Sequence, residues 1–107
     1  MKIGDNAPLS EQIYSAGLDH ADALAAAQLL EGGKSAYVSQ AMLRLGDMPV
    51  SKAEREVKGS ADYADYIKKM VAARRQANRL GAYRELLRAR LTEWQSDQAN
   101  ERHMSKI

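Results

Sequence analysis

The stretch "SKAEREVKGSADYADYIKKMVAARRQANRLGAYRELLRARLTEWQSD", residues 51–97, decides the fold because it contains no proline. Ser51 and Glu54 at its start match a capping box, in which the Ser51 side chain accepts from the amide of Glu54 and the Glu54 side chain reaches back. Two glycines are the only weak helix formers inside the stretch. The stretch therefore predicts one long helix that ends near residue 98.

A second long helix is expected over about 19–45, directly before the link "GDMP" at 46–49. Asp19 can cap its start. Gly46 suits the first position after the helix, and Pro49, just beyond, cannot continue it. Because the link is short, the two helices must run antiparallel. The sequence therefore predicts an all-α fold, a long antiparallel helical hairpin with coiled-coil-like assembly.

A short N-terminal helix is expected ahead of the hairpin, within the segment 1–18. Pro8 precedes "LSEQIYSA" and suits a helix start, and Gly17 can end that helix, which gives bounds of about 9–16. Valine and isoleucine never alternate with polar residues over a useful window, so no strand is expected.

Glycines leave the continuity of both long helices open. Gly32 and Gly33 interrupt the apolar pattern of the first, and each costs about 1 kcal/mol relative to alanine. We expect a continuous helix with a weak point there, and a break is the alternative; Gly81 raises the same question. The chain is interpreted as a single helical domain, 1–107, with the hairpin over 19–98 and a non-periodic tail over 99–107.

The composition predicts a thin core. The chain has 107 residues, and 45% of them are apolar, but alanine accounts for 18 and phenylalanine is absent. Helices of this composition can approach closely along alanine-rich seams. Folding alone would bury about two-thirds of the unfolded surface. Because this composition provides too little bulk for a thick core, a partner chain is an expected addition.

The chain has no cysteine, which excludes disulfides, thiolate chemistry and cysteine zinc sites. Its N-terminus lacks the apolar segment of a signal peptide, and no run approaches the 18 apolar residues of a membrane span. We expect a soluble, intracellular protein that does not contact the membrane.

Apolar side chains occupy two different sides of the predicted second helix. One set is Val57, Ala64, Ile67 and Val71, and the other, rotated by roughly 160°, is Leu80, Tyr83, Leu87, Leu91 and Trp94. A partner helix over 19–45 can cover only about 51–77, so the second set is expected to overhang.

The overhanging set predicts a homodimer. Leu80, Leu87 and Trp94 repeat at seven residues, which is coiled-coil spacing. An antiparallel crossing near Leu87 is favoured, because a parallel one would set arginines level with their own copies.

Residues 68–90 carry eight basic side chains and one acidic one, Glu85, on a chain whose net charge is only +2. The candidate binding residues are Lys68, Arg74, Arg75, Arg79, Arg84, Arg88 and Arg90. They fit sequence-independent phosphate binding to DNA, or contact with an acidic protein partner. The third interpretation is that arginine stems cover the apolar seam and pair with acids of a neighbour.

No catalytic or metal site is predicted. The acids of "DHAD" at 19–22 fit helix capping better than metal binding, and those of "DYADY" at 62–66 lack large aliphatic neighbours that would raise their pKa values. No Ser–His–acid set or glycine-rich phosphate loop is recognisable. The sequence therefore predicts a protein that is not an enzyme and needs no cofactor.

Three stretches carry a resemblance: "LLEGGKSAYVSQAMLRL" (29–45), "KAEREVKGSADYADYIKKMVAARRQANR" (52–79) and "YRELLRARLTEWQSDQANERHM" (83–104). In these the chain resembles a group of small helical proteins encoded by phages and prophages. Such proteins are often encoded near phage recombination functions. The resemblance implies an accessory role in DNA metabolism in the cytoplasm of a bacterial host cell, and it assigns no catalytic residue. It also implies that an acidic protein partner would be a host or phage protein.

Two functions are therefore carried forward. The first is a phage or prophage accessory protein that binds DNA, or a DNA-bound recombination partner, through the basic helix. The alternative is a phage-encoded inhibitor of a host defence system, similar to an anti-CRISPR protein, that acts by protein–protein binding.

Overall fold

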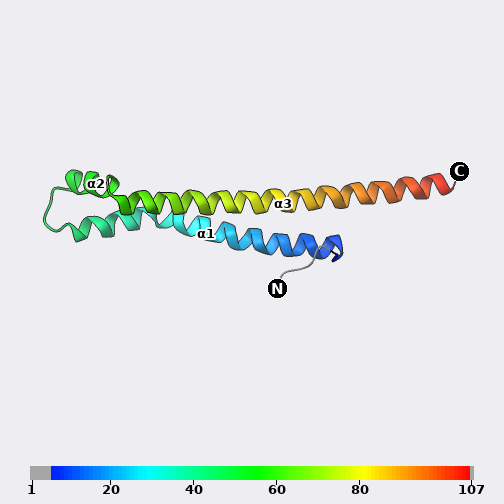
Figure 1. Cartoon of the computed structure of the whole chain (residues 1–107), viewed down its shortest axis with the longest axis horizontal. Helices are drawn as coiled ribbons and strands as arrows, with labels where there is room; N and C mark the ends of the chain where they lie inside the picture. The colour runs from blue at the N-terminus through cyan, green and yellow to red at the C-terminus, as the bar shows by residue number, and fades with distance from the viewer. Residues whose placement is uncertain (1–5, 107) are drawn as a thin grey trace. The chain divides into compact units, whose positions relative to one another are not determined.

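The computed structural model describes residues 6–106, and these form three helices: α1 (Leu9–Arg44), α2 (Val50–Lys58) and α3 (Ala61–Ser105) (Figure 1). The predicted all-α helical hairpin is confirmed. The fold divides into two compact units. Unit 1 contains α1 up to Asp22 and α3 from Asn78 onward, and unit 2 spans Ala23–Ala77.

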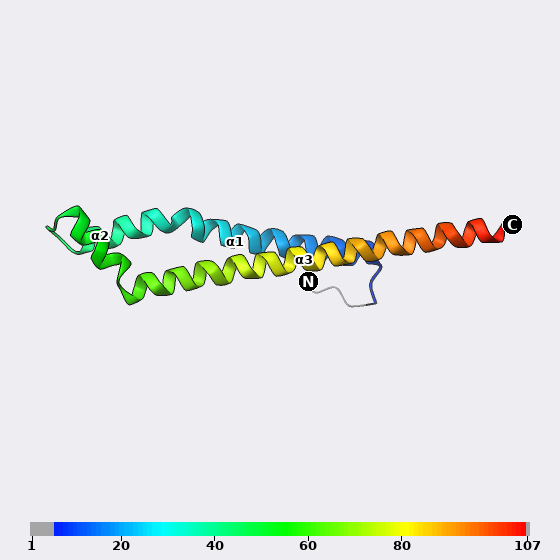
Figure 2. The ribbon, with the colours of Figure 1, turned by 90° about the horizontal axis from the view of Figure 1, so that it is seen from above.

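In unit 1, the first part of α1 runs antiparallel beside α3 (Figures 1 and 2). The Pro8 carbonyl accepts from the amides of Glu11 and Gln12 at 3.0 and 3.1 Å, which starts the helix where proline was expected to start it. The predicted end at Gly17 is wrong, because α1 continues through it. Ala16, next to Gly17, is 4% exposed, and we attribute the continuity to such packing, which overrides a propensity cost of about 1 kcal/mol.

This longer α1 overturns the predicted overhang. Leu87 is 1% exposed within its own chain, and Leu80 and Leu91 are half-buried. The partner segment starts at Leu9 instead of residue 19, so it reaches the second apolar set. The tail prediction is also wrong, because α3 remains helical to Ser105 and extends past the start of α1 (Figure 2).

Unit 2 contains the turn between the long helices. Gly46 adopts a φ of 78°, a conformation that glycine reaches without steric cost, and the predicted stop after α1 is confirmed. The predicted capping box at Ser51 is wrong. Pro49 holds the N-cap position of α2 without a side-chain cap, and Glu54 accepts from Lys58 at 2.6 Å.

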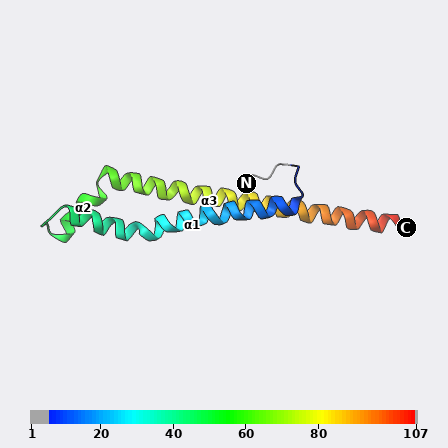
Figure 3. The ribbon, with the colours of Figure 1, turned by 90° about the horizontal axis from the view of Figure 1, so that it is seen from below.

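The single helix expected from residue 51 onward is broken after Lys58. Ser60 Oγ donates to the Val57 carbonyl at 2.6 Å and accepts from the Tyr63 amide at 3.2 Å. Ser60 thereby caps α3, and it also ties α3 to the end of α2. Figure 3 shows the resulting bend between the two helices.

The seam of unit 2 is built from tyrosines and alanines. Tyr66 donates from its hydroxyl to the Leu30 carbonyl at 2.5 Å and stacks on Tyr37 with ring centroids 4.6 Å apart. A β-carbon on Gly33 would lie 3.2 Å from the Tyr66 hydroxyl, so this glycine makes room for the tyrosine. Helix α1 continues through Gly32 and Gly33, as expected, without the alternative break. Nothing in the structure explains why position 32 is a glycine.

The buried face of α3 in unit 2 differs from the predicted one. Ala64 and Val71 are exposed, whereas Tyr63, Tyr66 and Met70 are half-buried. Of the predicted set, Val57 is buried and Ile67 is half-buried, and tyrosines take the places expected for Ala64 and Val71. The core of the described residues is small: Ala16, Ala27, Ala53, Val57, Ala77 and Leu87.

Across the described part of the chain, none of the helices offers a stretch long and apolar enough to traverse a membrane.

Candidate nucleic-acid interface

Positive charge is unevenly divided between the two units. Unit 2 holds nine basic and six acidic residues, an excess of three positive charges. Unit 1 holds seven basic and eight acidic residues, an excess of one negative charge. The net charge of +2 therefore comes from unit 2, and an anionic ligand is attracted there first.

Three cations of α3 in unit 2 are free for a ligand: Lys68, Lys69 and Arg75. All three are exposed. The ion pairs among residues 6–106 are Lys58–Glu54, Arg74–Glu31 and Arg88–Glu85, and none involves these three cations. Lys68 and Arg75 are seven residues apart, which places them on one side of the helix with about 10 Å between them along its axis.

Arg74, in contrast, is bound within the chain. Its guanidinium donates to Glu31 from Nε at 2.9 Å and from Nη2 at 2.5 Å. The hydrogen bond to Arg74 lowers the pKa of Glu31, and the same bond raises the pKa of Arg74. This bidentate pair links α1 to α3 in unit 2 and removes Arg74 from the candidate ligands.

In unit 1, the four predicted arginines have different surroundings. Arg84 is half-buried, and its Nε, which is buried and has no partner, would lie 3.5 Å from a β-carbon on Gly17. Arg88 donates to Glu85 at 3.1 Å. Arg79 and Arg90 are exposed. The seven predicted residues are thus divided between the seam, ion pairs and solvent, and they do not act as one uniform surface.

Helix α2 adds two exposed cations that the sequence-based prediction missed, Lys52 and Arg55. Ala53 and Val57 are buried on its other side. Lys58 is paired with Glu54, which lowers the pKa of Glu54 and raises that of Lys58. Val50, Ala53 and Val57 recur at helical spacing, which places Lys52 and Arg55 on the other side of the helix. This pattern could have revealed the two cations, but the prediction treated the segment as part of one long helix.

The predicted self-association residues are also divided. Leu87 is buried, and Leu80 and Leu91 are half-buried, whereas Tyr83 is 46% and Trp94 is 55% exposed. A hollow beside Trp94 is lined by Pro8, Leu9, Ser10, Leu91 and Trp94. The leucines therefore stabilise unit 1 itself, and only the aromatic members remain accessible to a partner.

The acids of the two other motifs do not converge. Asp19 lies inside α1 and caps nothing, and Asp62 and Asp65 are exposed. His20 is half-buried beside Gly81, where a β-carbon would lie 3.0 Å from its Nε2. Among residues 6–106, no three histidine, aspartate or glutamate side chains are grouped as metal ligands would be.

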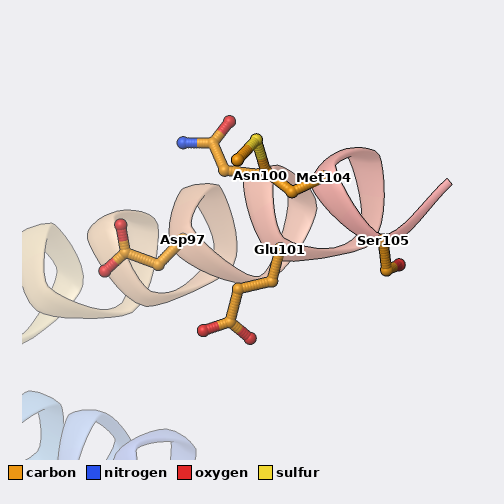
Figure 4. A pocket seen from close by; sticks show the side chains of 5 residues that line it. All are labelled: Asp97, Asn100, Glu101, Met104 and Ser105. Atoms are coloured by element: carbon orange, nitrogen blue, oxygen red, sulfur yellow. The ribbon is translucent and has the colours of Figure 1, made fainter. Parts of the chain in front are cut away.

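A further hollow lies along the end of α3, lined by Asp97, Asn100, Glu101, Met104 and Ser105. In Figure 4, Asn100 and Met104 lie above the helix and Glu101 below it, while Asp97 lies at the level of the ribbon. All five residues come from one helix, so their polar groups do not enclose a ligand.

No protein-family model, curated protein or solved structure matches this chain. Its function is therefore argued from its own residues.

Proposed function

We propose that the protein binds the phosphate backbone of DNA through α3 of unit 2, as a non-enzymatic accessory protein of a phage or prophage. The observation that carries this proposal is the set of three exposed and unpaired cations, Lys68, Lys69 and Arg75. Lysine and arginine side chains in solvent bind phosphates at a low desolvation cost, and the released counterions provide the driving force.

The surroundings of these cations support the proposal. The acids Glu31 and Glu54 are already neutralised by Arg74 and Lys58. Seven cations then remain in unit 2 against four exposed acids, Asp47, Glu56, Asp62 and Asp65, so the excess of three positive charges is unchanged. Lys52 and Arg55 of α2 add to the same excess.

The aromatic residues of unit 2 favour binding without sequence preference. Tyr66 is engaged by Tyr37 and by the Leu30 carbonyl, and Tyr63 is half-buried. Their rings are therefore not free to stack on unpaired bases, which is how many single-strand-binding proteins hold nucleotides. Contacts that remain available are with phosphates, which carry no sequence information.

The resemblance to phage and prophage proteins gives the biological setting. Proteins of that group are often encoded near recombination functions, where single-stranded DNA and proteins bound to it are present. A small protein with a basic helix can hold such DNA, or contact a protein already bound to it.

The test is a charge reversal of two of the three cations. In Lys68→Glu with Arg75→Glu, retention on immobilised single-stranded DNA is expected to be lost, while helicity by circular dichroism stays unchanged. Arg102→Glu with Lys106→Glu is the matched control, because it makes the same change in net charge at exposed residues of unit 1. Equal retention of both variants would remove α3 of unit 2 from the site.

One observation favours the alternative, an inhibitor that binds a host protein. An open hollow of about 320 Å³ at the turn of unit 2 is lined by Ser39, Met42, Leu43, Gly46, Met48, Val50 and Ala53. Leu43 is 80% and Val50 is 71% exposed there. Apolar side chains so exposed are typical of protein contacts.

The two functions differ in a pull-down from host lysate. An inhibitor retains one host protein after nuclease treatment and loses it in Leu43→Asp. A DNA-binding protein loses its co-purifying material on nuclease treatment, and Leu43→Asp has no effect.

A further inference from the structure

The chain exposes more surface than a folded monomer of its mass. Its accessible area is 8282 Å². A folded monomer of 11.8 kDa is expected to expose about 5,900 Å². A standard dimer interface covers about 800 Å² of each partner, so the difference of about 2,400 Å² per chain is more than one such interface needs.

Unit 1 presents one continuous exposed stripe on α3, away from the buried Leu87. The stripe contains Arg79, Tyr83, Leu86, Ala89 and Glu93, all of them exposed. At 100° per residue these positions fall within roughly 120° of the helix circumference. Tyr83 and Leu86 are each 46% exposed. Arg90 and Ala82, also exposed, fall in the same arc. The stripe thus combines apolar side chains with two arginines and one glutamate.

When the residues of this stripe are read in the opposite direction, the acidic residue takes the position of a basic one. Arg79 and Glu93 lie at equal distances on either side of Leu86, and so do Tyr83 and Ala89. When two copies cross antiparallel on a two-fold axis at Leu86, each Arg79 faces the other copy's Glu93. Each tyrosine is likewise level with the other copy's alanine. Arg90 is then level with the other copy's Ala82. Arg84 is level with the other copy's Arg88, but both lie outside the stripe, Arg84 beside Gly17 of α1.

We propose that two copies of this chain associate through the outward stripe of α3 in unit 1, antiparallel and centred on Leu86. A C2 interface uses the same surface patch on both subunits, so it needs a self-complementary patch of this kind. A parallel arrangement would place Arg79 beside Arg79 and Glu93 beside Glu93, which is destabilising. The predicted crossing at Leu87 is thereby replaced, because Leu87 is buried within its own chain.

The first test is a charge swap measured by sedimentation equilibrium. Arg79→Glu and Glu93→Arg are each expected to raise the dimer dissociation constant about tenfold, because two ion pairs become two like-charge pairs. The double variant, Arg79→Glu with Glu93→Arg, restores the wild-type constant. A monomeric wild-type chain, or a double variant as weak as the single variants, would overturn the proposal.

The second test uses single cysteines, since the native chain has none. Leu86→Cys is expected to form a homodimer disulfide readily, because that position lies on the two-fold axis. Tyr83→Cys and Ala89→Cys chains are expected to crosslink only when mixed. Thr92→Cys, exposed on another side of α3, is the control. Crosslinking no faster at 86 than at 92, or equal crosslinking of Tyr83→Cys alone, would contradict the arrangement.

This inference does not depend on the proposed function. The stripe belongs to unit 1, and the proposed DNA-binding cations belong to unit 2. If the variants at Arg79 and Glu93 lose the dimer but keep DNA retention, only the dimer depends on the stripe. If the variants at Lys68 and Arg75 lose DNA retention but keep the dimer, the two proposals are likewise separated.

Discussion

Two neighbouring leucines of α3 provide a direct test of how unit 1 is packed. Leu87 is 1% exposed, whereas Leu86 is 46% exposed. Truncating a buried leucine to alanine costs about 2–5 kcal/mol, because the change leaves a cavity as well as losing buried surface. Truncating a half-exposed leucine leaves no cavity and costs about 1 kcal/mol. We therefore expect Leu87→Ala to lower the free energy of unfolding by at least about twice as much as Leu86→Ala.

The assay is urea unfolding followed by circular dichroism, at two protein concentrations. With an m value of about 1.5 kcal/mol/M, Leu87→Ala lowers the midpoint by about 2 M and Leu86→Ala by less than about 1 M. The Leu87 effect does not change with protein concentration, because its packing lies within the chain. The Leu86 effect shrinks on dilution, because dissociation of a dimer removes its contribution.

Where Leu87→Ala is too unstable to measure, Leu87→Met keeps the comparison usable, since volume-conserving changes cost less than about 1.5 kcal/mol. Equal midpoint shifts for the two leucines would refute the assignment of Leu87 to the core of unit 1. The assignment would also be refuted if the destabilisation by Leu87→Ala disappeared on dilution, because Leu87 would then be buried by a second chain.

Two further predictions concern unit 2 and the glycines. Gly32→Ala, with no atom within 4 Å of the new β-carbon, is expected to stabilise the protein by about 1 kcal/mol in thermal unfolding. Gly81→Ala is expected to give the same stabilisation only together with His20→Ala, because the new β-carbon lies 3.0 Å from His20 Nε2. An equal stabilisation by Gly81→Ala alone would contradict that contact. Arg74 lowers the pKa of Glu31 below its ordinary value of 4.5. The ion pair therefore stabilises the folded state above pH 4.5, and its contribution to the free energy of unfolding is lost as the pH falls through the lowered pKa. Glu31→Gln should therefore lose less stability than the wild type on acidification below that pH, and identical pH profiles would contradict the ion pair.

The helical class and the turn could be predicted from sequence, because they depend on local chemistry. Gly46 ends α1 through its own backbone conformation. Gly17 and Gly59 have the same propensity, yet only the second lies at a helix end. The difference comes from their neighbours: a buried alanine precedes Gly17, and Ser60 caps the helix that follows Gly59. Packing of this kind is not visible in a local pattern.

The candidate site shows the same limit. The sequence located the dense positive charge on residues 68–90, but not which side chains are free. Arg74 and Arg75 are adjacent and chemically identical. Only the first is held by Glu31, a residue far away in the sequence. Which arginine is free is therefore decided by the register of α1 against α3 in unit 2.

The central claim is that three free cations of unit 2 bind phosphates, and its most direct test is the salt dependence of DNA binding by the wild-type protein. Fluorescence anisotropy of a labelled single strand, titrated between about 50 and 200 mM salt, gives the affinity at each concentration. Three phosphate contacts predict a slope of log affinity against log salt of about −2 for a single strand and nearer −3 for a duplex. Absence of saturable binding at the lowest salt, or a slope near zero, would contradict the claim.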